Sequence, residues 1–157
     1  AFGDPFDGDI RVGVVGGLAA QAQRAGVAEV GIADTIGVAD PWLVRARIEE
    51  VRMYAPDVYL RAHFHDTRGT GLANVFAAIE AEVDTIDASC GGIGGCPFAP
   101  GATGNVVTED VVYMLERAGF ETGIDLSKLI SVSKWLEGVL GHSVPSALLK
   151  AGSFPIA

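Results

Sequence analysis

The sequence is poor in basic residues and has no long apolar run. Its 157 residues include 11 Lys and Arg against 20 Asp and Glu, a formal net charge of −9, which argues against a surface for nucleic acid or for an anionic membrane. No apolar run reaches the roughly 18 residues of a membrane span, and no basic-then-apolar signal peptide opens the chain. We therefore expect no nucleic-acid partner and no membrane.

Cysteine is also scarce, with only Cys90 and Cys96 present. Two cysteines at this spacing build neither a disulfide framework nor a zinc finger. A reducing compartment is favoured, either a bacterial cytoplasm or the mitochondrial matrix of a eukaryotic cell. The chain also lacks an initiator Met and opens abruptly on Ala1-Phe2-Gly3-Asp4-Pro5. We expect it to be the inner part of a longer protein.

What the sequence does contain is a regular alternation of short apolar runs and amphipathic stretches. A hydrophobic share of 49% over 157 residues predicts a single globular domain, 1–157. Strands are predicted over 29–33, 58–65 and 85–89, helices over 12–25, 41–54, 72–81, 108–118 and 126–140, and a loop over 1–10. Strands and helices alternating at intervals of about 30 residues predict an α/β fold with a parallel sheet. The charged residues expected to be mostly solvated on the second helix are Arg45, Arg47, Glu49, Glu50 and Arg52.

Two histidines end the second predicted strand, His63 and His65. Strand side chains alternate between faces, so both imidazoles point one way and Phe64 the other, with histidine Cα atoms roughly 6.5–7 Å apart. They precede a glycine-containing turn at the carboxyl end of the strand, where α/β enzymes carry their chemistry. Spacing alone leaves core packing and metal binding equally open.

Four motifs follow one another along the chain. They are Gly31-Ile32-Ala33-Asp34-Thr35-Ile36-Gly37, His63-Phe64-His65-Asp66-Thr67, Gly92-Ile93-Gly94-Gly95-Cys96-Pro97-Phe98-Ala99, and Gly101-Ala102-Thr103-Gly104-Asn105 with Thr108-Glu109-Asp110. In order and spacing they resemble the carboxyl-terminal half of 3-hydroxy-3-methylglutaryl-CoA (HMG-CoA) lyases, metal-dependent enzymes with TIM barrels. The resemblance implies a partial (β/α)8 TIM barrel, with its last three strands, the exit of the fifth and C-terminal helices. A full barrel takes about 250 residues, so we expect this chain not to close one.

The resemblance also implies a divalent cation, Mg²⁺ or Mn²⁺, with His63, His65 and Asn105 as its ligands. Nitrogen and oxygen ligands with room for water suit such ions. Without the resemblance, Asn105 would be interpreted as a helix-capping or loop residue. The family's first strand supplies an acidic ligand and a catalytic Arg, and that segment is absent here.

For catalysis, the resemblance implies Cys96 as a thiol on a loop that closes over the substrate. Asp34 or His63 would be the base, although a carboxylate at the end of a strand also caps turns. Cys90 is interpreted as a packing residue, because free cysteine behaves as a small buried hydrophobe.

Three further residues are expected around the site. Asp66 would orient a histidine from outside the ligand set, although Asp34 and Asp66 could exchange roles. Thr35 and Arg68 would contact the substrate, Arg68 through the phosphates of CoA.

The implied reaction cleaves HMG-CoA to acetyl-CoA and acetoacetate, as in leucine degradation and ketone body metabolism. The base removes the hydroxyl proton, Cys96 protonates the acetyl-CoA enolate, and the cation offsets the developing negative charge. Because the first-strand segment is absent, we expect the chain alone to be inactive with its acyl-CoA substrate.

Two other functions stay open. Isopropylmalate and homocitrate synthases, and biotin-dependent carboxyltransferases, also use a His-x-His pair, but the Gly-Gly-Cys-Pro loop favours the lyase. Alternatively, the chain is a non-catalytic half-barrel. Its unpaired sheet edges and uncovered apolar interior would then favour a homodimer, or pairing with the missing amino-terminal half.

Overall fold

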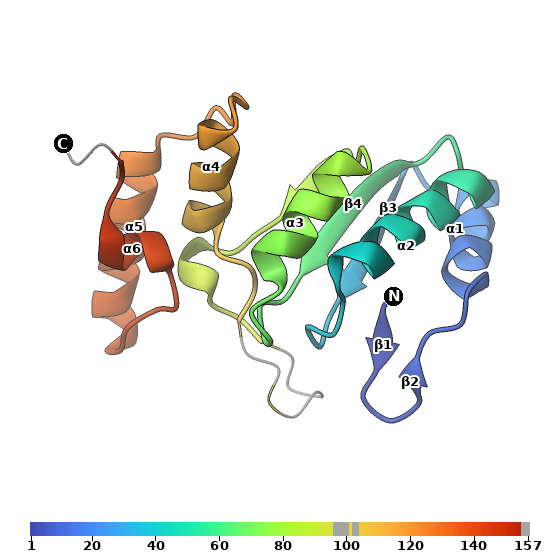
Figure 1. Ribbon diagram of the computed structural model, residues 1–157, viewed down its shortest axis with the longest axis horizontal. Helices are drawn as coiled ribbons and strands as arrows, with labels where there is room; N and C mark the ends of the chain where they lie inside the picture. Colours follow the sequence, from blue (N-terminus) through green and yellow to red (C-terminus); the bar gives the residue numbers. More distant parts are fainter. Residues whose placement is uncertain (96–100, 102–103, 155–157) are drawn as a thin grey trace. The chain divides into compact units, whose positions relative to one another are not determined.

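The computed structural model describes residues 1–95, 101 and 104–154 (Figure 1). Contacts divide these residues into two compact units. The first unit is built on Ala1–Asp87, and the second on 88–95 and 104–154. The predicted single domain over 1–157 stays a prediction.

A parallel sheet forms the centre of the first unit. It has the order β3-β4-β5, made of Glu29–Asp34, Tyr59–Phe64 and Thr85–Asp87. The register pairs Ala33 with His63, and His63 in turn with Asp87. The predicted α/β class and the three parallel strands are therefore confirmed.

Three helices cover one face of this sheet: α1 (Val14–Arg24), α2 (Pro41–Tyr54) and α3 (Gly71–Glu80). Figure 1 shows them on one side of β3 and β4. Alternate strand residues face them and form the buried core, namely Ile32, Leu60, Ala62 and Phe64. The start of α2 is fixed as predicted, because the Asp40 carboxylate accepts hydrogen bonds from the amides of Trp42 and Leu43, both at 2.9 Å.

The opposite face of the sheet is polar. It carries Glu29, Tyr59, Arg61, His63 and Asp87, all exposed or half-buried. Arg61 forms ion pairs with carboxylates on both neighbouring strands. The expected uncovered apolar interior is therefore wrong for this face, because Glu29, Arg61 and Asp87 place charged side chains on it.

The amino terminus forms a small hairpin where the sequence predicted only a loop. Two-residue strands β1 (Gly3–Asp4) and β2 (Gly8–Asp9) pair antiparallel. The Asp4 carboxylate closes the turn by accepting hydrogen bonds from the amides of Phe6 at 2.8 Å and Asp7 at 2.9 Å. Strands this short carry too few residues for a period-two pattern to reveal them.

A buried ion pair joins α1 to α2, at residues that the sequence predicted to be solvated. Arg47 is 3% exposed and Glu50 is 8% exposed, with Nη1 and Oε2 2.6 Å apart. Oε1 of Glu50 also accepts hydrogen bonds from the amides of Gly13 at 2.9 Å and Gly16 at 2.8 Å. Arg47 donates to the carbonyl of Ile10 as well. A carboxylate on α2 thus caps the first turn of α1, which is a non-local contact.

The two adjacent glycines of α1 differ in their surroundings, which gives a matched pair of variants. A Cβ on Gly16 would lie 2.6 Å from Tyr54 Cδ2 and 2.9 Å from Glu50 Cγ, whereas one on Gly17 would meet nothing within 4 Å. We expect Gly16→Ala to lower the free energy of unfolding by about 2 kcal/mol through overpacking. Gly17→Ala should raise it by about 0.5–1 kcal/mol. Urea unfolding of both variants measures the difference, and equal effects would contradict this close packing.

The second unit is helical. After the short 3₁₀ turn η1 (Cys90–Gly92) come α4 (Thr108–Arg117), α5 (Leu126–Leu140) and α6 (Ala147–Ala151). The predicted helices over 108–118 and 126–140 are confirmed, while α6 was not predicted. Asp110 caps α6 across the chain, accepting from the amides of Ala147 at 3.0 Å and Leu148 at 2.8 Å. Among the described residues, no helix is long and apolar enough to cross a membrane.

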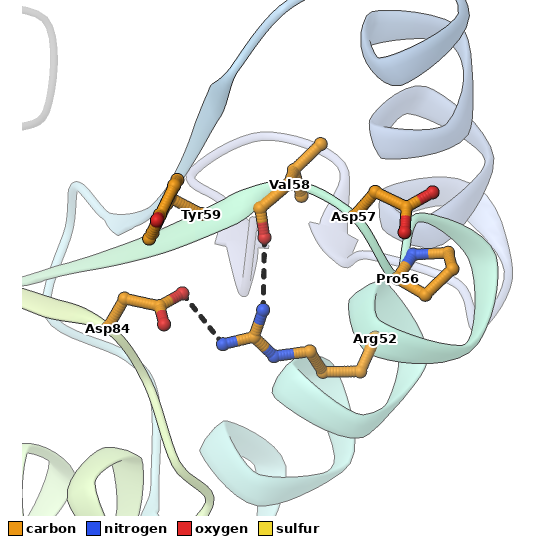
Figure 2. Close-up of a pocket in the computed structure, with 6 residues that line it drawn as sticks. All are labelled: Arg52, Pro56, Asp57, Val58, Tyr59 and Asp84. Carbon is orange, nitrogen blue, oxygen red and sulfur yellow. Dashed lines mark hydrogen bonds and ion pairs between the residues drawn. The ribbon is translucent and has the colours of Figure 1, made fainter.

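A small open pocket lies at the amino end of β4 (Figure 2). Arg52 donates to the carbonyl of Val58 at 3.0 Å and to the Asp84 carboxylate at 2.8 Å. That carboxylate also accepts a 2.6 Å hydrogen bond from the amide of Leu60. These bonds tie the end of α2 to the start of β4. The pocket lies at the opposite end of β4 from His63, so we do not place the candidate site there.

Candidate metal and substrate site

The carboxyl ends of β3 and β4 bring most of the predicted site residues of the first unit to one edge of the sheet. Asp34 is the last residue of β3 and Thr35 follows it, exposed. His63 lies within β4, whose last residue is Phe64, and His65 comes directly after the strand. Parallel pairing makes these ends neighbours, as expected for the edge that carries chemistry in α/β folds.

The two histidine rings converge, as the sequence predicted. Their centroids are 5.3 Å apart with an interplanar angle of 63°. Phe64 is fully buried in the opposite direction, 6.0 Å from the ring of Phe2. Burial, reinforced by the neighbouring His63, lowers the pKa of His65, and Asp34 opposes the shift in part. The neutral imidazole that this favours is the form that binds metal ions.

Two unpartnered atoms fit the predicted ligand set. His65 Nδ1 is buried and has no hydrogen-bond partner among the described residues, and the same holds for Asn105 Oδ1 in the second unit. The amide nitrogen of Asn105 donates to the carbonyl of Ile93 at 2.8 Å, which leaves its oxygen as the free atom. An imidazole nitrogen and a carboxamide oxygen are both metal-ligand types.

In the described part of the chain, no three His, Cys, Asp or Glu side chains form a group that could hold a metal ion. The predicted set therefore depends on the two histidines and on the carboxamide of Asn105. Because Asn105 belongs to the other unit, its joining the histidines stays a prediction.

Asp34 holds the loop that follows β3. It is 1% exposed, and its two oxygens accept hydrogen bonds from the amides of Val38 at 2.9 Å and Ala39 at 3.0 Å. This is the turn-capping role that the sequence offered as the alternative to catalysis. Its role as a base stays a prediction.

Asp66 and Arg68 contact backbone in this structure. Asp66 Oδ1 accepts a 2.7 Å hydrogen bond from the amide of Gly71, at the start of α3. Its carboxylate therefore caps the start of this helix, and its predicted role in orienting a histidine stays a prediction. Arg68 Nη1 donates to the carbonyls of Ile36 at 2.8 Å and Gly37 at 3.0 Å, so it fastens the β3 loop to the β4 loop. Substrate contacts by Arg68 and Thr35 stay predictions.

A carboxylate that the sequence did not suggest lies beside His63, namely Asp87 at the end of β5. Its Oδ2 is 3.7 Å from His63 Nδ1, while its Oδ1 is 2.5 Å from Arg61 Nη1. Sequence reasoning missed it. The signal was available, since an acidic residue at the carboxyl end of the third parallel strand must lie near the end of the second.

The loop predicted to carry catalysis is only partly described. Cys96 lies outside the described residues, so its predicted role stays a prediction. The start of this loop is held by Glu109 of α4. This fully buried carboxylate accepts hydrogen bonds from the amide of Gly91, at 3.1 and 2.9 Å. Gly91 has a φ of 65°, which favours glycine. Cys90 is half-buried with Sγ 3.0 Å from Ser133 Oγ, in keeping with packing.

Comparison with known families agrees with the motifs. Residues 2–136 match the HMGL-like family model. The chain belongs to the HMGL-like family. The predicted resemblance to HMG-CoA lyases is thereby confirmed.

Among curated relatives, the (R)-citramalyl-CoA lyase of Chloroflexus aurantiacus is 46% identical over 97% of this chain and 48% of its own length. The hydroxymethylglutaryl-CoA lyase YngG of Bacillus subtilis is 42% identical over 95% of this chain and 50% of its own length. The chain thus spans about half the length of these HMGL-like relatives.

Solved structures give the same result. An HMG-CoA lyase from Acinetobacter baumannii, in complex with coenzyme A and 3-methylmalate, aligns with a TM-score of 0.93 at 44% identity. The alignment covers 99% of this chain and 51% of that one. The carboxyl transferase domain of Rhizobium etli pyruvate carboxylase aligns with a TM-score of 0.72 at 24% identity, which shows a shared fold alone.

Proposed function

We propose that this chain is the carboxyl-terminal half of a divalent-metal-dependent lyase that cleaves HMG-CoA to acetyl-CoA and acetoacetate. The observation that carries the proposal is the convergence of His63 and His65, 5.3 Å apart at the carboxyl end of β4, in a chain of the HMGL-like family. The buried, unpartnered Nδ1 of His65 supports a ligand role. HMG-CoA lyases of about twice this length align with the chain over half of their own length, which supports its being half of such an enzyme.

In this proposal the described sheet is the last three strands of a (β/α)8 barrel. The polar face formed by Glu29, Arg61 and Asp87 supports it, since this face would line the interior of the closed barrel beneath the histidines. Helices α1, α2 and α3 would belong to the outer ring. The rest of the barrel would bring the missing acidic ligand and Arg.

His63, His65 and Asn105 would hold Mg²⁺ or Mn²⁺. When bound, the ion supplies Lewis-acid stabilisation of the negative charge that develops on oxygen. Because the Nδ1 of His63 is 3.7 Å from Asp87 Oδ2, His63 would present Nε2 to the ion. One nitrogen cannot bind a cation and receive a proton at once, so we assign His63 to the cation and proton removal to Asp34.

The proton of the tertiary hydroxyl would pass to an Asp34 oxygen. Each of these oxygens accepts one backbone hydrogen bond and keeps a lone pair. The hydroxyl oxygen becomes the ketone of acetoacetate as the adjacent carbon–carbon bond breaks. That electron pair moves to the α-carbon of the thioester, and Cys96 would return a proton there. Asp34 is buried beneath the turn that contains Val38 and Ala39, so this turn would have to open for the substrate hydroxyl to reach the carboxylate.

A second substrate is favoured by one observation. The Chloroflexus aurantiacus relative, 46% identical, is named an (R)-citramalyl-CoA lyase. Citramalyl-CoA also carries a tertiary hydroxyl β to its thioester, and the same bond cleavage would give acetyl-CoA and pyruvate. The ketone product therefore distinguishes the two substrates.

A chimera tests the proposal. This chain would replace the matched half of YngG, so that a related amino-terminal half completes the barrel. We expect the chimera to release acetoacetate from HMG-CoA in the presence of Mn²⁺, and EDTA to abolish this. The chain alone should give at most about a thousandth of that rate, because the Arg that stabilises charge is missing.

The control is the same chimera with His65→Ala. A folded chimera that cleaves neither acyl-CoA would refute the lyase, and full turnover by the chain alone would refute the half-enzyme. Inactivity together with a stable homodimer on a sizing column would instead support the self-associating half-barrel.

A further inference from the structure

We infer that Asp87 and Arg61 are positioning residues that fix which nitrogen His63 presents to the site, an inference that rests on the proposed function only for its metal. The ion pairs run across all three strands of the sheet. Arg61 on β4 directs Nε to Glu29 on β3 at 2.7 Å and Nη1 to Asp87 on β5 at 2.5 Å. Its Nη2 also donates to Glu29 at 3.2 Å.

Arg61 determines how the Asp87 carboxylate is oriented. Because the guanidinium is planar and already bonded twice to Glu29, Nη1 holds Asp87 Oδ1 in a defined direction. The other oxygen, Oδ2, then lies 3.7 Å from His63 Nδ1. This distance is longer than a hydrogen bond, but the negative charge still favours a proton on the nearer nitrogen.

The tautomer of His63 follows from this geometry. With its proton on Nδ1, the neutral ring has its lone pair on Nε2, the nitrogen remote from Asp87. Carboxylates commonly orient metal-binding histidines in this way, and losing one weakens metal binding by about 10- to 100-fold. Thus Asp87 would orient a ligand histidine, a role that the sequence predicted for Asp66.

Arg61 determines which way the side-chain amide of an Asp87→Asn variant would point. An asparagine at 87 would keep its oxygen on the Arg61 guanidinium, which only donates. Its amide NH₂ would then face His63 Nδ1, and the positive end of that dipole favours the lone pair, not the proton, on the nearer nitrogen. We therefore expect the tautomer to reverse, with the ring proton moving to Nε2 and the lone pair turning toward residue 87.

The experiment is long-range ¹H–¹⁵N NMR of histidine-labelled chain at pH 8 without metal. We expect the Nδ1–H tautomer at His63 in the parent, the Nε2–H tautomer in Asp87→Asn, and a mixture in Arg61→Met. Tyr59→Phe is the control, because this exposed residue lies on the same strand outside the ion pairs, and it should leave the tautomer unchanged.

A second measurement in the chimera is Mn²⁺ affinity by water relaxation. Asp87→Asn should weaken it about 10- to 100-fold and Tyr59→Phe by less than about 3-fold. The Nε2–H tautomer in the parent, or Mn²⁺ affinity that Asp87→Asn leaves unchanged, would overturn the inference. Since neither readout requires bond cleavage, tautomer reversal in an inactive protein supports it while the lyase proposal fails.

Discussion

Replacing His65 by alanine is expected to lower the affinity of the chimera for Mn²⁺ by more than about 100-fold and to abolish acetoacetate release. His65 is 5% exposed, and its Nδ1 is buried with no hydrogen-bond partner among the described residues. Because His65 is a proposed direct ligand, its loss should exceed the 10- to 100-fold loss typical of residues that only orient a ligand. Isothermal titration with Mn²⁺, together with an acetoacetate assay, measures both effects.

His142 provides the control, since it is exposed and its Nδ1 lies 3.0 Å from the carbonyl of Ser143. His142→Ala should change Mn²⁺ affinity by less than about 2-fold, because exposed residues away from a site have small effects. Circular dichroism checks that each variant is folded. A folded His65→Ala variant with parental Mn²⁺ affinity would remove this residue from the ligand set.

Glu50→Gln is expected to lower the free energy of unfolding by about 3 kcal/mol at pH 7. The change leaves the Arg47 guanidinium buried without its counter-charge, and breaking a buried pair costs about 3–5 kcal/mol. Glutamine still offers an oxygen to the amides of Gly13 and Gly16, so we expect the lower end of that range. Glu49→Gln, the exposed neighbour on the same helix, should change stability by less than about 0.5 kcal/mol.

The stability difference between the parent and Glu50→Gln is also expected to depend on pH. Burial alone would raise the pKa of Glu50, but hydrogen bonds from Gly16, Arg47 and Gly13 outweigh it, so the pKa lies below its usual value. A depressed pKa stabilises the fold above the unfolded value of about 4.3, and this contribution is lost as pH falls through the folded pKa. The stability gap between parent and Glu50→Gln should therefore narrow below about pH 4. Urea unfolding from pH 3 to 7 measures it, and a constant gap would show that charge is not the cause.

Local signals in the sequence predicted the helices and strands well. The Asp40-Pro41 pair set the start of α2, and the apolar spacing that predicted a helix over 126–140 matches α5. Apolar runs predicted β3, β4 and β5 to within a few residues. The short helix α6 was not predicted, because it is capped partly by the distant Asp110.

The candidate site was predicted in part. Strand alternation predicted that His63 and His65 converge, which follows from two residues on one strand. The partners of each side chain are non-local, and so the roles of Asp66, Arg68 and Asp87 did not follow from spacing. The prediction that the charged residues of α2 are solvated failed for the same reason. Arg47 and Glu50 lie at helix positions that are usually exposed, but here they bond to residues in and just before α1.

The ion pairs from Glu29 through Arg61 to Asp87 connect all three strands of the sheet without help from any residue outside the first unit. Such cross-links penalise a one-residue slip, because sliding β4 would turn the guanidinium to the wrong side. This part of the protein therefore has its own means of choosing the correct strand alignment. A half-length segment with this property could be exchanged between related proteins by recombination, because the register of its strands would not depend on the other half.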